Sequence, residues 1–163
     1  MISLTLDEDR LRLALIGQAR SGDPADPVAS AKGYYEWCDQ LDPDGRLGWK
    51  SGHARGLARA LYHVNLYEAE HGRPMVGALA INVMKGQAGG GFLTCHRDAG
   101  LPDAPDETGT GRATWRMALE ESVKYWQSDH ADDEQHRLSD AQFDAIMAEL
   151  GKIKQMLRTL RHG

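Results

Sequence analysis

Hydrophobic residues recur at helical spacing in five stretches of the chain, and this periodicity predicts five helices. The stretches run from 6 to 20, 28 to 41, 53 to 71, 113 to 128 and 139 to 163. Thr5 followed by Glu8 has the form of a capping box at the start of the first helix. Gly72, with Pro74 after it, is expected to end the third.

A shorter apolar segment, MVGALAINV at 75–83, lies between Pro74 and a glycine-rich stretch. An apolar run of this length with such flanks predicts a buried strand. Phe92 and Leu93 are then expected either to return as the second strand of a hairpin or to open a short helix toward Gly100. The fold class that follows is α+β, mainly helical, with one short β-hairpin between Met75 and Phe92.

The most regular pattern lies at the carboxy-terminal end, where six apolar residues alternate spacings of three and four over almost three heptads. These six are Phe143, Ile146, Leu150, Ile153, Leu157 and Leu160. They predict an amphipathic helix whose seam either packs on the rest of the chain or forms a coiled coil with another copy, which makes the protein a homo-oligomer. Residues 1–128 are expected to form one α+β domain and the polar residues 129–138 a linker.

Composition adds broad limits to this picture. The 163-residue chain has 41% hydrophobic and 26% charged residues, values typical of a globular domain. Its two cysteines suggest neither a disulfide framework nor a zinc site, and no apolar run approaches the roughly 20 residues of a membrane helix. We therefore expect a cytoplasmic protein without a membrane partner. The net charge of −5 argues against general coating of nucleic acid, although a local basic patch can still bind it.

Candidate chemistry is concentrated between residues 68 and 91. Glu68 continues the apolar stripe of its helix, so it is either a catalytic carboxylate or a solvated or salt-bridged one. Glu68 or Glu70, with Arg73 as an anion clamp and Asn82 or Lys85 beyond, could serve a small hydrolase or nuclease. No complete catalytic signature is present, so the sequence leaves enzyme status open.

Cofactor motifs are absent from the sequence. The glycine cluster at 86–91 lacks the Gly-Lys-Ser/Thr ending of a P-loop and opens no long helix, as a dinucleotide fingerprint would. Cys95 beside His96 is a weak nucleophile pattern, because adjacent residues do not face each other. We expect neither a cofactor nor a metal.

The run Glu68-Ala69-Glu70-His71-Gly72-Arg73-Pro74, followed by the apolar segment and Gly89-Gly90-Gly91-Phe92, resembles a block in a family of small, uncharacterised bacterial and phage proteins. The resemblance covers about residues 55 to 126. It implies a shape and a bacterial or phage origin, but no activity.

A second resemblance concerns the helix beginning near Ala54 and the glycine-rich turn after it. Together they look like the recognition helix and wing of alkyltransferase-like winged-helix DNA-binding proteins, in which arginines contact phosphates or bases. Arg55 and Arg59 share a helix face at i and i+4. The family's Pro-Cys-His-Arg or Pro-Trp-His-Arg block is missing, since Met75-Val76-Gly77-Ala78 follows Pro74, and this departure argues against alkyl transfer.

Three functional hypotheses follow. The first is a DNA- or RNA-associated binding module, defence-related in one version, that uses Arg55, Arg59, Arg73 and Lys85 and oligomerises through its last helix. The second is the hydrolase or nuclease described above. The third is an interaction or assembly protein without catalysis.

Overall fold

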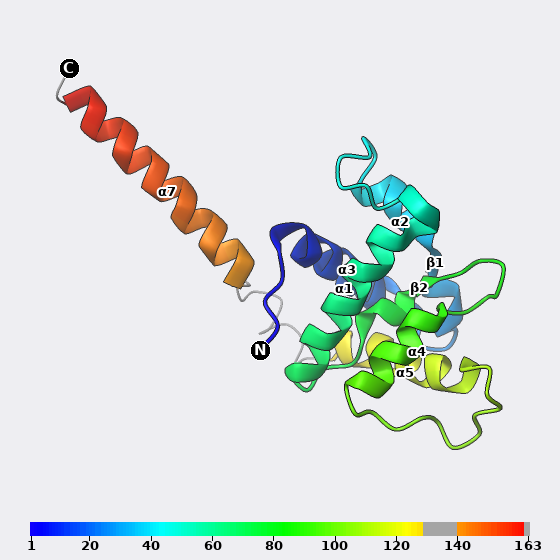
Figure 1. Ribbon diagram of the computed structural model, residues 1–163. Coiled ribbons are helices and arrows are strands. Elements are labelled where there is room, and N and C mark those ends of the chain that lie inside the picture. The colour runs from blue at the N-terminus through cyan, green and yellow to red at the C-terminus, as the bar shows by residue number, and fades with distance from the viewer. Residues whose placement is uncertain (129–139, 162–163) are drawn as a thin grey trace.

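The computed structural model describes residues 1–128 and 140–161 (Figure 1). Helices α1 to α5 share one hydrophobic core, and α7 extends away from them. The elements, in chain order, are α1 (Leu6–Ser21), η1 (Pro27–Ser30), β1 (Lys32–Gly33), α2 (Tyr34–Leu41), α3 (Ser51–Glu70), η2 (Val76–Leu79), β2 (Ala80–Ile81), α4 (Gly90–Asp98), α5 (Arg112–Trp126) and α7 (Asp140–Arg161). The described residues are therefore mainly helical, with one small sheet.

Helix α1 begins where the sequence predicts, and its capping box is confirmed. The backbone N–H of Glu8 donates to Oγ1 of Thr5 at 3.2 Å, and the N–H of Thr5 donates to Oε2 of Glu8 at 2.8 Å. These reciprocal bonds satisfy two N–H groups that a helix start otherwise leaves free. Leu11 and Leu15 then direct the helix into the core, where both are fully buried.

The centre of the fold is η2, a short 3-10 helix in contact with α1, α3 and α5. Its backbone lies in the core, so its polar groups need partners from elsewhere in the protein. Trp115 Nε1 donates to the Ala78 carbonyl at 2.9 Å, Trp37 Nε1 donates to the Leu79 carbonyl at 3.3 Å, and the Gly77 N–H donates to Asn65 Oδ1 at 2.8 Å. Side chains thus replace the neighbouring strands that this segment lacks.

The predicted strand over 75–83 is confirmed only in part, and the predicted hairpin is wrong. Residues 75–80 are buried as expected, whereas Val83 is exposed. Only Ala80–Ile81 is a strand, and it pairs in parallel with Lys32–Gly33. A single antiparallel bridge between Asn82 and Gln87 closes the following turn. Phe92 lies in helix α4, as the second alternative predicted, because Phe92 and Cys95 face the core at helical spacing.

Two helix starts also differ from the prediction. The helix expected from residue 28 begins at Tyr34, because the chain first forms the 3-10 turn at 27–30 and the strand β1. In α3, three successive residues have left-handed backbone angles, with φ of 58° at Gly52, 60° at His53 and 61° at Ala54. The right-handed part of α3 therefore starts at Arg55. Its end at Glu70 is followed by Gly72 with φ of 68°, the left-handed cap that the sequence predicts.

Helix α7 approaches α1 at one end and points away from the other helices along its length (Figure 1). The predicted linker, residues 129–138, lies outside the described residues. The helix before it, α5, ends at Trp126. Among residues 1–128 and 140–161, no helix combines the length and apolar character needed to cross a membrane.

Candidate functional site

Glu68, the first catalytic candidate, lies fully buried between two arginines. Arg12 Nε donates to Oε1 of Glu68, Arg73 Nε donates to Oε2 at 2.6 Å, and Arg73 Nη2 donates to Oε1 at 3.3 Å. Both guanidinium groups are almost completely buried as well. Since both carboxylate oxygens accept hydrogen bonds from cations, the geometry is that of a structural ion-pair network joining α1, α3 and the segment before η2.

Aromatic rings enclose this network. The guanidinium carbon of Arg12 lies 5.5 Å from the ring centroid of Tyr67 and 5.7 Å from that of Trp126, and that of Arg73 lies 5.4 Å from Tyr67. Cations over ring faces at these distances are attracted by the ring electrons. Sequence reasoning missed Arg12, yet a pattern was available: Arg12 lies on the buried stripe of α1 four residues before Ile16, as Glu68 lies on that of α3.

The other catalytic candidates do not join Glu68 in one cavity. Glu70 is partly exposed at the end of α3, and its Oε2 accepts the Ile2 N–H at 2.7 Å. Arg73 and Asn82 line different pockets, and Lys85 is exposed on the turn after Asn82. Arg73 borders a pocket of about 560 Å³, but the fully buried Glu68 does not line it, so this carboxylate and its predicted anion clamp do not face one substrate space.

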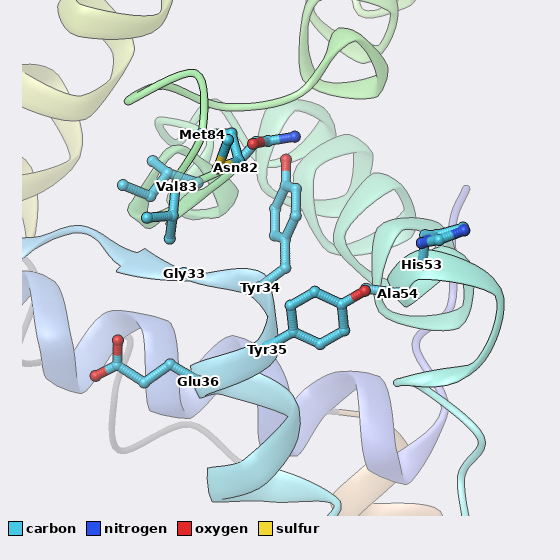
Figure 2. Close-up of a pocket in the computed structure, with 10 residues that line it drawn as sticks. Gly33, Tyr34, Tyr35, Glu36, His53, Ala54, Asn82, Val83 and Met84 are labelled. Carbon is cyan, nitrogen blue, oxygen red and sulfur yellow. The ribbon is translucent and has the colours of Figure 1, made fainter.

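A pocket of about 360 Å³ lies where the starts of α2 and α3 meet the turn after β2 (Figure 2). The ring of Tyr34 points toward Asn82 and Met84, and Tyr35 points toward Ala54. The Tyr34 hydroxyl accepts the Gly89 N–H at 2.6 Å, and burial raises the pKa of this phenol. The wall is mainly apolar and aromatic, with Glu36 and His53 as its ionisable members apart from the two tyrosines.

The rim of this pocket is exposed and partly strained. Val83 is 71% exposed and Met84 is 96% exposed, although both are apolar. His53 and Ala54 have left-handed backbone angles, which cost roughly 1–2 kcal/mol per non-glycine residue. Sequence reasoning missed this pocket, because it assigned Val83 to a buried strand and His53 to a regular helix.

The predicted nucleic-acid contacts divide into two groups. Arg55 and Arg59 are exposed on α3 and form no ion pair with any residue that the structure describes. Lys85 is exposed on the turn that borders the pocket, while Arg55 follows Ala54 on its opposite wall. Arg73, by contrast, is held in the core by Glu68. Three of the four predicted cations are therefore open to a phosphate group.

The predicted oligomerisation seam of α7 lies entirely at the surface. Its six residues, Phe143, Ile146, Leu150, Ile153, Leu157 and Leu160, are 45% to 76% exposed. Two further apolar residues beside the seam, Met147 at 51% and Met156 at 65% exposure, were not part of the sequence prediction. Their positions next to the seam could have identified them, since each lies one residue from a seam residue.

Comparisons with protein-family models, with curated proteins and with solved structures found no match to this chain. Over residues 1–128 and 140–161, histidine, cysteine and carboxylate side chains form no group of three or more that could hold a metal ion. The proposals for function therefore rest on the geometry of the exposed α7 seam and of the exposed arginines of α3, Arg55 and Arg59.

Proposed function

We propose that this protein is a self-assembling module in which α7 joins copies of the chain. The observation that carries the proposal is the exposure of every residue of a three-heptad apolar seam on a helix of 22 residues. No described residue of α1 to α5 buries that seam, so a partner from outside the chain is the simplest means to cover it.

The energetics of α7 support this proposal. Burial of a leucine- or isoleucine-sized side chain contributes about 1.5–3 kcal/mol, so six of them contribute on the order of 10 kcal/mol per helix before entropy costs. Most of the stability of a helix in a protein comes from tertiary packing of its apolar face, and the seam of α7 is exposed rather than packed on the described helices α1 to α5. Association thus supplies the packing that α7 lacks within one chain.

Paired substitutions in α7 test the proposal. Leu150→Gln with Leu157→Gln removes two seam side chains, whereas Arg158→Gln with Thr159→Gln changes two exposed positions on another face of the same helix. Sedimentation velocity at equal protein concentration should show the unmodified chain and the control pair as assemblies and the seam pair as a monomer. Identical sedimentation of all three proteins would contradict assembly through this seam.

Nucleic-acid binding is a second candidate, supported by the exposed guanidiniums of Arg55 and Arg59. In this proposal α3 takes the place of a winged-helix recognition helix, and the 82–87 turn with Lys85 takes the place of the wing. Assembly through α7 would present several such faces together and raise the avidity for DNA or RNA. The carboxylate of Glu36, which lines the pocket in Figure 2, would repel a phosphate group. In this proposal the nucleic acid therefore contacts α3 at Arg55 and Arg59 rather than the part of the pocket beside Glu36.

Salt dependence tests the second candidate. Three phosphate contacts predict a slope of about −2.7 in a plot of log affinity against log salt concentration, or about 40-fold weaker binding between roughly 50 and 200 mM salt. Arg55→Ala with Arg59→Ala should reduce that slope by about two. The control pair Arg46→Ala with Arg116→Ala removes two surface arginines that already pair with Asp44 and Glu120. Absence of binding at low salt would end this proposal.

The geometry does not favour the hydrolase or nuclease hypothesis. Glu68 is enclosed by its two guanidinium partners, and Arg73 is committed to the same network.

A further inference from the structure

We infer that the α7 helices associate in parallel, as a bundle of three or four copies of this chain. The inference rests on the proposed self-assembly and specifies its partner, its orientation and its number of chains. Three features of the exposed face carry it: the residue types within the seam, the residues beside the seam, and the positions of two charges.

The seam has a single heptad register. Spacings of three and four place Phe143, Leu150 and Leu157 at the first core position, a, and Ile146, Ile153 and Leu160 at the second, d. In parallel coiled coils, β-branched residues at a with leucine at d favour two strands, whereas leucine at a with isoleucine at d favours larger bundles. This helix has leucine at two of its a positions and isoleucine at two of its d positions, so its core favours more than two chains.

The exposed apolar face of α7 is also wider than a two-stranded seam. Met147 occupies position e and Met156 occupies position g, and both are more than half exposed. In a two-stranded coiled coil these flanking positions usually carry charged residues that stay in water. Additional helices around the core cover the flanks more fully. The two methionines therefore agree with the core residues on a bundle larger than a dimer.

Charge placement sets the orientation. In parallel helices a residue at g approaches the residue at e of the next heptad on its neighbour. Glu149 at g and Lys154 at e, five residues later, therefore form an attractive pair between parallel chains. An antiparallel arrangement brings flanks of the same type together, which places Lys154 against Met147 or another Lys154 and leaves Glu149 beside Met156. Within one helix Glu149 also binds Lys152 at 2.9 Å, which holds the carboxylate on this flank.

Cysteine cross-linking of the complete chain tests the orientation. Residues 143 and 160 are 17 positions apart, which corresponds to about 25 Å along a helix. A disulfide needs Cα atoms within about 7 Å, so Leu160→Cys can link to itself only between parallel helices. Mixed Phe143→Cys and Leu160→Cys chains would cross-link to each other in an antiparallel arrangement. Cys38 and Cys95 are buried, and the unmodified chain in the same glutathione buffer measures any background.

A charge exchange gives an independent test of the same orientation. Lys154→Glu should weaken the assembly several-fold, because it places Glu149 against a second carboxylate on the neighbouring helix. Glu149→Lys combined with Lys154→Glu restores opposite charges at the two positions and should recover most of the lost affinity. Equal affinity for the single and double variants would overturn the parallel pairing.

Sedimentation equilibrium of the unmodified chain separates the possible failures. A mass of three or four chains, together with Leu160→Cys homodimers on a non-reducing gel, is the expected result. A two-chain mass would overturn the number while leaving self-assembly intact, and cross-linking between positions 143 and 160 would overturn the orientation. A monomer at every concentration would remove the proposed function itself, and this inference with it.

Discussion

Arg73 donates two hydrogen bonds to Glu68, five residues earlier in the chain, and both side chains are buried beside Arg12, Tyr67 and Trp126. This contact joins the end of α3 to the segment that enters the core as η2. A carboxylate that first suggested catalysis thus has a role in holding the fold together.

Replacement of Glu68 by glutamine should lower the free energy of unfolding by about 3–5 kcal/mol, because it removes the carboxylate from between two buried guanidiniums. Urea denaturation measures the change. Glu70→Gln provides the control, since its carboxylate is partly exposed and should contribute less than about 1 kcal/mol. Similar losses for the two variants would contradict a buried structural ion pair.

The protein should lose stability at alkaline pH. The Tyr62 hydroxyl donates to Oδ2 of Asp98 at 2.5 Å, and this bond raises the pKa of Tyr62 from 10.0 to about 12. Burial raises the pKa of the Cys95 thiol from 9.0 to about 12. The folded state therefore keeps protons that the unfolded state releases, so the free energy of unfolding falls as pH rises from the unfolded toward the folded pKa values.

Urea midpoints at about pH 8 and about pH 11 measure this alkaline effect. Tyr62→Phe removes one of the groups whose pKa is raised by folding, so its stability should depend less steeply on pH than that of the unmodified chain. An unchanged pH dependence in Tyr62→Phe would show that the Asp98 bond does not govern this titration.

Two glycine substitutions should have opposite effects on stability. A Cβ atom at Gly77 would lie 2.5 Å from the Asn65 side-chain amide, so Gly77→Ala should destabilise the protein by about 1–3 kcal/mol. A Cβ atom at Gly17 in α1 would meet nothing within 4 Å beyond its own helix, and Gly17→Ala should stabilise by roughly 0.5–1 kcal/mol. Thermal unfolding of the two variants checks both signs, and a stable Gly77→Ala protein would contradict the close packing of η2 on α3.

Gly151 offers the same substitution inside α7. A Cβ atom there would meet nothing within 4 Å beyond its own helix, and the position lies outside the seam, so Gly151→Ala should favour the helix by about 1 kcal/mol per chain. If α7 drives assembly, this variant should assemble at lower protein concentration than the unmodified chain. Gly17→Ala, which acts on α1, should leave the association constant unchanged.

Local patterns in the sequence predicted the helices well. The Thr5–Glu8 capping box and the left-handed Gly72 depend on neighbours within a few residues, and both occur where expected. The apolar run 75–83 was predicted to be a buried strand; residues 75–80 are buried, but only Ala80–Ile81 is a strand. Its hydrogen-bond partners, Trp37, Asn65, Trp115 and Ser122, lie far away in the chain, so the run itself does not distinguish a strand from a 3-10 helix.

The candidate sites show the same dependence on distance. Arg12 and Glu68 are 56 residues apart, and only the folded chain brings these two charged residues together. The pocket in Figure 2 likewise combines three separate segments, residues 33–36, 53–54 and 81–84. Hydrophobic periodicity reveals neither the strand before α2 nor the left-handed residues at the start of α3. The α7 seam was accessible from sequence because all six of its residues lie on one helix.

The molar mass of the unmodified 163-residue chain tests the central proposal most directly. Sedimentation equilibrium at several loading concentrations, from about 1 to about 100 µM, covers the range in which a moderately tight assembly forms and dissociates. Self-assembly through α7 predicts a multiple of 18.0 kDa that decreases toward 18.0 kDa on dilution or on Leu150→Gln with Leu157→Gln substitution. A mass of 18.0 kDa at every concentration would contradict the proposal.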